Sequence, residues 1–242
     1  MFKIQINKKT NNLFLFIFKF VFKIPLNIKS LKNINIEKKN FLRTQNSNFL
    51  KNLISKNNFF FFILITEKGE DLNKIEERKF FKDYIHHCKS NFGIKETYIN
   101  QKLEFINIKI FLKKFLPHFS IKFEEILINT KLIISPCHGD LHKKNVLKSR
   151  NNFFVIDLLT LSFESSYVFD LINFKLISSK YYNNNWYYLL SKYQNKFYKF
   201  LDKKYFLFFA LWKIENEVKF LYIDENKIKK YKKIINDIFS RY

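Results

Sequence analysis

The chain has 242 residues, with 44 Lys and Arg against 21 Asp and Glu, and a formal net charge of +23. Its 47% hydrophobic and 19% aromatic residues can form a sizeable core, which excludes a disordered basic tail. Three Gly and three Pro exclude collagen-like and low-complexity chains. Two cysteines, Cys88 and Cys137, exclude a disulfide framework and suit a reducing compartment, so we expect a cytoplasmic protein.

The positive charge comes almost entirely from lysine, because the chain has only four arginines. Nucleic-acid-binding proteins commonly use Arg for bidentate phosphate and base contacts. The basic residues are also spread along the chain rather than clustered. This pattern favours a solvated surface over a nucleic-acid-binding surface.

The first 66 residues are rich in predicted strands. Met1–Ile6 and Leu13–Phe18 flank a polar turn at Asn7–Asn12, which predicts a hairpin, and a third strand covers Phe20–Leu26. A helical region with Ser30 as its cap is expected from Ser30 to Ile54, followed by one strand from Phe59 to Thr66.

Two apolar runs within this part invite a membrane interpretation. The run from Leu13 to Phe22 is interrupted by Lys19, and the run from Phe59 to Ile65 is far too short to span a bilayer. Both are more typical of buried strands, so we expect no transmembrane segment.

Gly69 lies in a charged segment directly after the last of these strands, which indicates a hinge between two lobes. We therefore predict an N-terminal nucleotide-binding lobe at 1–66, a hinge at 67–72 and a helical C-terminal catalytic and substrate lobe at 73–242. Beyond the hinge, apolar residues recur at helical spacing, notably over Ile106–Phe115, Ile121–Ile128 and Trp186–Phe239. Strands are expected only at Lys131–Ile134, Val146–Lys148 and Phe153–Ile156.

The chemically densest stretch lies among these three strands. Asp140 and Asn145 are five residues apart in a loop, and Asp157 comes at the end of the following hydrophobic strand. Phosphoryl transfer requires a carboxylate to orient and deprotonate an alcohol, and oxygen ligands to hold magnesium on the phosphates. The loop and the strand end together supply such groups.

The motif His138-Gly-Asp-Leu-His-Lys-Lys-Asn145, followed by Val155-Ile-Asp157 and Asp170-Leu171, resembles the signature of the aminoglycoside phosphotransferase and choline kinase superfamily. The resemblance implies an α+β, protein-kinase-like two-lobe fold with a small antiparallel-sheet N-lobe and a mainly helical C-lobe. It also implies that Asp140 is the catalytic base and that Asn145 and Asp157 are magnesium ligands. His138 and Asp170 then support the catalytic loop structurally.

Upstream, the same resemblance assigns nucleotide contacts. Lys23, in the third strand, takes the place of the lysine that contacts the α- and β-phosphates, and Lys19 is the alternative on the same strand parity. Glu37 is the expected ion-pair partner of that lysine. Phe62–Leu72, which contains Glu67, resembles the segment between the lobes whose backbone binds the adenine.

Two departures from the family pattern stand out. The turn Asn7–Asn12 contains no glycine, so backbone amides approach a phosphate less closely there. Leu158 and Leu159 follow Asp157, where many relatives carry an aromatic residue and an acid. Substrate contacts that depend on that acid do not transfer to this chain.

The expected function is an ATP- and Mg²⁺-dependent kinase that phosphorylates a hydroxyl of a small molecule. Candidate acceptors are an amino alcohol such as choline or ethanolamine, or a sugar of a surface polysaccharide. A cationic aminoglycoside suits a chain of charge +23 less well. One alternative is a kinase-like nucleotide-binding protein with weak catalysis, and another is a basic RNA-binding protein.

Two aromatic segments, Tyr181–Tyr188 and Phe208–Trp212, favour helix packing in the core. An alternative interpretation is that their rings enclose a quaternary ammonium group by cation–π attraction.

Overall fold

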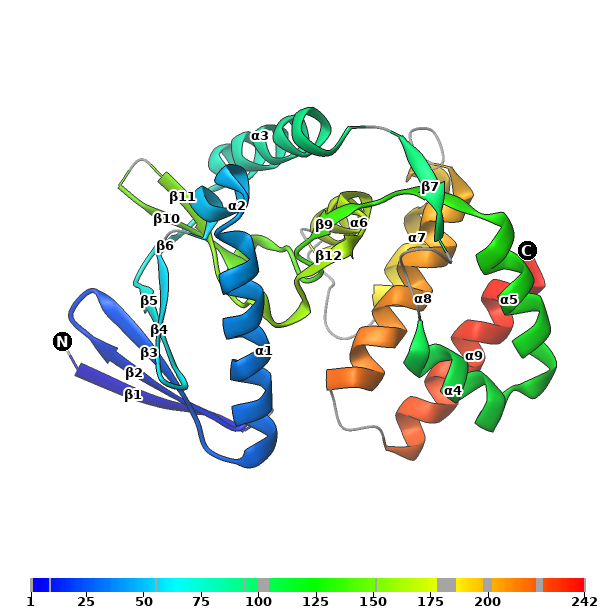
Figure 1. The fold of residues 1–242 in the computed structure, drawn as a ribbon, viewed down its shortest axis with the longest axis horizontal. Coiled ribbons are helices and arrows are strands. Elements are labelled where there is room, and N and C mark those ends of the chain that lie inside the picture. The colour runs from blue at the N-terminus through cyan, green and yellow to red at the C-terminus, as the bar shows by residue number, and fades with distance from the viewer. Residues whose placement is uncertain are drawn as a thin grey trace. The chain divides into compact units, whose positions relative to one another are not determined.

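The computed structural model describes residues 2–8, 10–54, 56–93, 95–99, 105–150, 152–177, 186–197, 202–220 and 224–241. These residues form two compact units, each made of two chain segments (Figure 1). Unit 1 comprises Met1–His87 and Asp140–Ser162, and unit 2 comprises Cys88–Gly139 and Phe163–Tyr242. This division follows packing and does not test the predicted hinge at 67–72, which stays a prediction.

Unit 1 is built on an antiparallel sheet with the strand order β1-β2-β3-β5-β4. The hairpin of β1 (Phe2–Asn7) and β2 (Asn12–Ile17) and the third strand β3 (Phe20–Pro25) are confirmed. In the glycine-free turn, Asn11 adopts a positive φ of 51°. Asparagine tolerates this left-handed conformation better than most residues, so the turn closes without glycine.

The helical region that follows is divided into two helices, α1 (Ile28–Thr44) and α2 (Asn48–Leu53). The prediction that Ser30 caps the first helix is wrong, because Asn27 is the N-cap. The Asn27 side chain accepts a hydrogen bond from the backbone N–H of Ser30 at 2.8 Å, and the Ser30 hydroxyl accepts one from the backbone N–H of Asn27 at 3.0 Å. Ser47 caps α2 in a similar way through the backbone N–H of Leu50. The sequence pattern therefore predicted the helical region, but it assigned the N-cap to Ser30, which is the N3 residue of a capping box with Asn27.

The prediction of a single strand from Phe59 to Thr66 is also wrong. Two antiparallel strands are present, β4 (Asn57–Phe60) and β5 (Ile63–Glu67), joined at Phe61 and Phe62. Phe61 adopts a positive φ of 52°. Since phenylalanine is not a typical turn residue, nothing in this apolar run signals the reversal.

The sheet has an inner and an outer face, because antiparallel partners directly opposite each other point to the same side. Helix α1 packs on the inner face, where its Phe41 ring lies 5.3 Å from the Phe59 ring of β4. On the outer face, the pairing registers bring together the following apolar residues: Phe2, Ile4, Ile6, Leu13, Leu15, Ile17, Phe20, Phe22, Ile24, Phe60, Ile63 and Ile65.

A second, three-stranded sheet of unit 1 has the order β11-β10-β6. It consists of β6 (Glu70–Asp71), β10 (Val146–Ser149) and β11 (Asn152–Val155), so the two predicted strands near 146 and 153 are confirmed. Gly69 lies against this sheet, because a Cβ atom built there would come within 2.5 Å of the Leu147 Cβ. The short helices η3 (Lys143–Asn145) and η4 (Leu158–Thr160) flank the strand pair. Helix α3 (Lys74–Phe92) begins in unit 1 and ends in unit 2.

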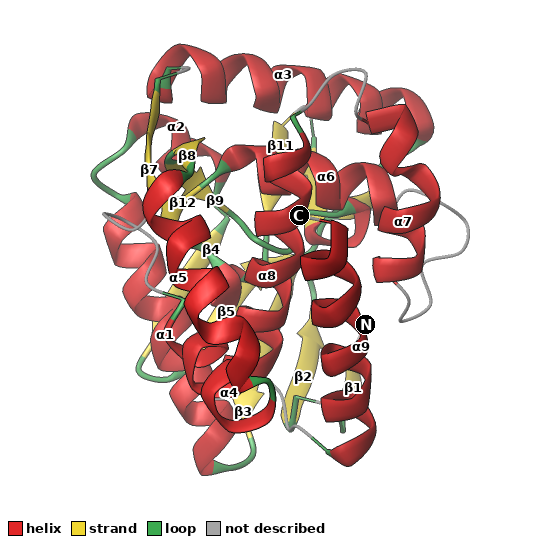
Figure 2. Ribbon diagram, turned by 90° about the vertical axis from the view of Figure 1, so that its right-hand side faces the viewer, coloured by secondary structure: helices red, strands yellow, loops and turns green. Residues whose placement is uncertain are grey.

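Unit 2 is mainly helical. Around α8 (Lys203–Phe220) pack α4 (Ile106–Phe115), α6 (Tyr167–Ile177), α7 (Trp186–Phe197) and α9 (Glu225–Arg241), while α5 (Ser120–Asn129) packs on α4 (Figure 2). The predicted periodicity from Trp186 to Phe239 therefore corresponds to three helices among the described residues. The 3₁₀ turn η2 (Pro117–Phe119) joins α4 to α5.

Four short strands complete unit 2. The predicted strand at 131–134 is present as β8 (Lys131–Ile133), which pairs with β7 (Glu96–Tyr98), and β9 (Ser135–Cys137) pairs with β12 (Ser162–Ser165). Strands β6, β7, β9 and β12 have two to four residues each, too few for a periodic signal, and the sequence did not predict them. Within the described part of the chain, no helix has the length and apolar character that crossing a membrane requires.

The aromatic segment on α8 forms core. Phe208, Phe209 and Trp212 are buried, and Trp212 packs 5.4 Å from the Phe169 ring of α6. This confirms the packing interpretation for α8, since buried rings offer no open cage to a cation. Tyr181 and Tyr182 of the other segment lie outside the described residues.

Candidate functional site

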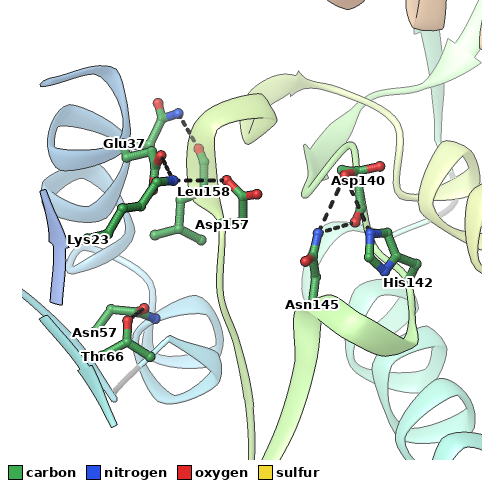
Figure 3. A network of polar contacts seen from close by, with 10 residues as sticks. Lys23, Glu37, Asn57, Thr66, Asp140, His142, Asn145, Asp157 and Leu158 are labelled. Carbon is green, nitrogen blue, oxygen red and sulfur yellow. Dashed lines mark hydrogen bonds and ion pairs between the residues drawn. The ribbon is translucent and has the colours of Figure 1, made fainter. Parts of the chain in front are cut away.

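Lys23, Glu37 and Asp157 meet on the inner face of the sheet of unit 1 (Figure 3). The Lys23 ammonium nitrogen lies 2.5 Å from Glu37 Oε1 and 3.6 Å from Asp157 Oδ1. Lys23 is on β3, Glu37 is on α1, and Asp157 follows β11. Lys19, the alternative considered from the sequence, is exposed in the turn between β2 and β3.

Burial shapes the protonation of this group. Desolvation alone lowers the pKa of Lys23, but the negative charges of Asp157 and Glu37 outweigh it and raise the pKa, so the ammonium stays protonated. Glu37 is fully buried, and its Oε2 atom has no hydrogen-bond partner among the described residues. This burial raises the pKa of Glu37 to about 7, although the positive charge of Lys23 acts in the opposite direction. Lys23 is therefore a permanent positive charge on the inner face of the central strand of the sheet.

Asp140, His142 and Asn145 form a second group in unit 1 (Figure 3). The Asn145 side-chain nitrogen donates to the Asp140 backbone carbonyl at 2.9 Å and lies 3.5 Å from Asp140 Oδ2. His142 caps the short helix η3, because its Nδ1 accepts a hydrogen bond from the Lys144 backbone N–H at 3.1 Å. The imidazole proton is thereby placed on Nε2, which lies 3.5 Å from Asp140 Oδ2.

The sequence interpretation left His142 undecided between the site and the solvent. In the structure its side chain is mostly buried and contacts the predicted catalytic base. Its two ring nitrogens have different partners, so it holds Asp140 in one orientation while the Asp140 carboxylate remains partly exposed.

Asp157 adopts a left-handed backbone conformation with a φ of 63°, which is uncommon for aspartate. The backbone on both sides is fixed by polar contacts: the Asn57 amide donates to the Val155 carbonyl at 2.8 Å, and the Asn40 amide donates to the Leu158 carbonyl at 2.8 Å. The Ile156 N–H also donates to the Asn145 carbonyl at 3.0 Å. Strained backbone persists where its surroundings determine it so fully, and it is concentrated at functional sites.

A cavity of about 390 Å³ borders these groups. Its volume lies within the range of small-molecule sites. Its walls come from the inner face of the sheet, the predicted hinge and the strand pair β10–β11: Phe14, Phe16, Val21, Lys23, Leu64, Thr66, Glu67, Lys68, Gly69, Asn145, Leu147, Ile156 and Asp157. Apolar side chains predominate in the contact surface; the polar residues of the lining are Lys23, Thr66, Glu67, Lys68, Asn145 and Asp157, and no described residue of the turn Asn7–Asn12 contributes to it.

Glu67 lines this cavity, but its polar groups are engaged elsewhere. Its carboxylate accepts hydrogen bonds from Ser149 Oγ at 2.7 Å and from Lys56 Nζ at 2.9 Å, and these contacts lower its pKa. The Glu67 N–H donates to the Lys56 carbonyl, and the Lys68 N–H donates to the Lys19 carbonyl. These two backbone N–H groups are thus used within the protein.

His138 and Asp170 lie in unit 2. The two carboxylate oxygens of buried Asp170 accept hydrogen bonds from the backbone N–H groups of His138 at 2.7 Å and Gly139 at 2.8 Å. These are the two residues before Asp140, so Asp170 fixes the start of the loop. Burial, and then the charge of Asp170, raise the pKa of the Cys137 thiol, which makes this cysteine unreactive.

The donor set fits a magnesium ion that also binds phosphates. Among the described residues, no three His, Cys, Asp or Glu side chains form a metal-binding group. Magnesium on a nucleotide usually takes only one or two protein ligands, with phosphate oxygens and water completing the shell. Asn145 uses its amide nitrogen on Asp140, so its amide oxygen is the atom that faces the Asp157 side in Figure 3. The Asp157 side chain is 45% exposed and borders the same cavity.

Several solved structures share this fold over nearly the whole chain. Choline kinase LicA from Streptococcus pneumoniae is 17% identical, with a TM-score of 0.57 over 99% of this chain and 93% of that chain. The ADP-bound aminoglycoside phosphotransferase APH(2'')-Ib is 15% identical, with a TM-score of 0.57 over 98% and 91%. The streptomycin–ATP complex of APH(2'')-IIa is 16% identical, with a TM-score of 0.56 over 98% and 91%. No protein-family model and no curated protein sequence matches the chain.

The predicted fold class is therefore confirmed: the chain has the α+β, two-lobe fold of the protein-kinase-like small-molecule kinases, with an antiparallel N-terminal sheet. At these identities the likeness shows the fold alone. The roles assigned to Lys23, Glu37, Asp140, Asn145 and Asp157 stay predictions. Asn40 and Asn57, which fix the backbone around Asp157, are residues that sequence reasoning missed.

Proposed function

We propose that the protein is a phosphotransferase that moves the γ-phosphoryl group of ATP to a hydroxyl of a small molecule. The observation that carries the proposal is the convergence of Lys23, Asn145 and Asp157 on one cavity of unit 1. The cavity offers an apolar wall for a base, a fixed positive charge for phosphates and two oxygen ligands for a cation. Solved structures with this fold include complexes with ADP and ATP, which supports nucleotide binding by this chain.

Each polar group has a role in this proposal. Lys23, oriented by buried Glu37, contacts the phosphates, while Asn145 and Asp157 hold a magnesium ion, which neutralises phosphate charge when bound. Asp140 accepts the proton of the acceptor hydroxyl. The hydroxyl oxygen then forms a bond to the γ-phosphorus, the bond from phosphorus to the bridging oxygen breaks, and ADP leaves with the electron pair.

His142 and Asp170 act as positioning residues in this scheme. The Nε2–H of His142 faces the Asp140 carboxylate, and Asp170 fixes the backbone that precedes Asp140. Residues 67–72 are the proposed hinge between the two lobes. A small amino alcohol or a sugar is the proposed acceptor class.

The proposal is tested by offering Mg-ATP and a panel of alcohols that includes choline, ethanolamine and hexoses. We expect transfer to one class of alcohol, and its loss in Asp140→Ala and in Asp157→Ala. If the wild type binds Mg-ATP without transferring phosphate to any alcohol or to water, the result would favour the alternative of a non-catalytic nucleotide-binding protein. That alternative has its own support, because no described residue of the glycine-free turn Asn7–Asn12 lines the cavity.

A further inference from the structure

The outer face of the N-terminal sheet is an apolar surface that no described helix of unit 1 covers (Figure 1). Along β1, Phe2, Ile4 and Ile6 are 64%, 55% and 58% exposed. Their register partners on β2 are half-buried and apolar, and β3 continues the same pattern. Exposed apolar residues on helices, such as Ile75 and Ile121, are instead set among polar neighbours. A continuous apolar face of this kind marks an interaction surface.

We propose that this outer face docks on the surface of an anionic lipid bilayer. The inference is independent of the proposed phosphotransferase activity, because the nucleotide cavity lies on the opposite face of the same sheet.

Charge indicates which partner the face suits. Residues 1–68 contain thirteen Lys and Arg against two acidic residues, so they carry a net charge of +11, whereas the remaining 174 residues carry +12. The difference comes from the scarcity of acids, since lysine is spread evenly along the chain. Both acids are paired, Glu37 with Lys23 and Glu67 with Lys56. An apolar face framed by unneutralised lysines is complementary to anionic headgroups over acyl chains.

Lysines and aromatic rings lie together at the ends of this face. Phe18 in the β2–β3 turn is 83% exposed, and the Lys19 ammonium beside it lies 5.3 Å from the Phe20 ring. The Lys68 N–H donates to the Lys19 carbonyl, so both lysines are at this end. At the other end, Phe60 and Phe61 are 60% and 67% exposed, and the Lys38 ammonium donates to the Phe61 carbonyl from α1, on the inner side of the sheet. Rings and lysines paired in this way are typical anchors at a membrane interface.

Two other occupants fit the face less well. A second copy of the chain brings another +11 against this charge, which opposes association. A nucleic acid is bound through hydrogen-bond donors and cations on the contact surface itself. Within the paired strands of the described sheet, the outer face carries only Asn58 and Glu67 as polar side chains.

The test is co-flotation of the full chain with vesicles of phosphatidylcholine, with and without phosphatidylserine. We expect binding to the phosphatidylserine vesicles that weakens with added salt. The triple variant Phe2→Ser, Ile4→Ser, Ile6→Ser is expected to lower this partition by about a hundredfold, because three exposed side chains lose their apolar contact. The matched control is the triple variant Ile75→Ser, Ile110→Ser, Ile121→Ser, whose positions lie on helices and are 79%, 60% and 74% exposed. Its binding to the vesicles is expected to equal that of the wild type.

A second variant keeps the test valid if β1 tolerates serine poorly. Lys19→Gln with Lys68→Gln is expected to lower binding about fivefold for each lysine removed, whereas Lys113→Gln with Lys114→Gln on α4 leaves it unchanged. The proposal is overturned if the wild type does not float with anionic vesicles at low salt, or if the triple variant floats equally well. It is also overturned if the triple variant keeps its vesicle binding but loses self-association or RNA binding. Loss of self-association would assign the face to a second copy of the chain, and loss of RNA binding would assign it to a nucleic acid.

Discussion

The inner and outer faces of the N-terminal sheet are built from alternate residues of the same strands, but their surroundings differ. The inner face meets α1 and borders the cavity, and it carries one charged residue in the middle of β3, Lys23. The outer face meets no described helix of unit 1 and is apolar along its paired strands except at Asn58 and Glu67. The outer face is the more apolar of the two, whereas the covered inner face also carries polar residues such as Gln5, Asn57 and Thr66, so apolar content does not reveal which face is covered. Lys23 reveals the covered face, because a charged residue in the middle of an apolar strand requires an oppositely charged partner, here Glu37 of α1.

The largest expected effect on phosphoryl transfer comes from substituting, one at a time, two adjacent residues of β3 whose side chains point to opposite faces of the sheet. Lys23→Met is expected to lower phosphoryl transfer by about 10²–10³-fold, since it removes one positioned charge from the phosphates. Ile24→Thr, one residue along and on the outer face, is expected to change transfer by no more than roughly a factor of two. Initial rates of phosphoryl transfer to the same acceptor compare the two variants. Equal losses of activity would contradict the assignment of the nucleotide site to the inner face.

Burial of Glu37 on the inner face makes stability depend on pH. Its pKa is raised from 4.5 to about 7 in the folded protein, so the folded state holds its proton across a range in which the unfolded state has lost it. The free energy of unfolding therefore falls as pH rises from 4.5 to 7, by up to about 3 kcal/mol. Glu37→Gln removes this dependence. Urea unfolding of both proteins across this range measures the difference, and parallel profiles would contradict it.

Gly69 tests how closely the cavity wall packs on the strand pair β10–β11. Gly69→Ala is expected to destabilise the protein by about 2–3 kcal/mol, because the new Cβ meets Leu147 and Phe154 within 3 Å. Gly93→Ala is the matched control: its φ of +73° imposes backbone strain of about 1 kcal/mol, but the position faces open space. Chemical denaturation compares the two, and a smaller loss at Gly69 would disprove the close contact.

His142 provides the smallest expected effect. His142→Ala removes the Nε2–H contact to the Asp140 carboxylate and is expected to lower kcat about tenfold, with KM for the nucleotide unchanged. His86→Ala, an exposed histidine on α3, serves as the control and is expected to behave as the wild type. A rise in KM without a fall in kcat would indicate that His142 acts on nucleotide binding instead.

The sequence predicted the parts of the molecule whose signals are local. The spacing of Asp140, Asn145 and Asp157 located the polar loop, and the strand and helix patterns placed Lys23 and Glu37 in adjoining elements. The hairpin of β1 and β2 and most helices of unit 2 followed from the period of their apolar residues. The reversal at Phe61 and Phe62 did not, because the turn uses residues that also favour strands.

The remaining features depend on contacts between distant parts of the chain. Asn40 and Asn57 bind backbone carbonyls 118 and 98 residues away, and an isolated asparagine on a helix or at a strand end gives no sign of such a partner. The left-handed conformation of Asp157 results from these contacts rather than from its own preference. The uncovered outer face was likewise hidden, because the two apolar runs were expected to be buried.

Binding of Mg-ATP, measured by titration calorimetry on the wild type, Lys23→Met and Lys19→Met, tests most directly whether the inner-face cavity is a nucleotide site. The two lysines lie four residues apart, but only Lys23 faces the cavity. The wild type and Lys19→Met are expected to bind equally, and Lys23→Met at least about tenfold more weakly. No binding by the wild type, or equal weakening by the two substitutions, would contradict the account.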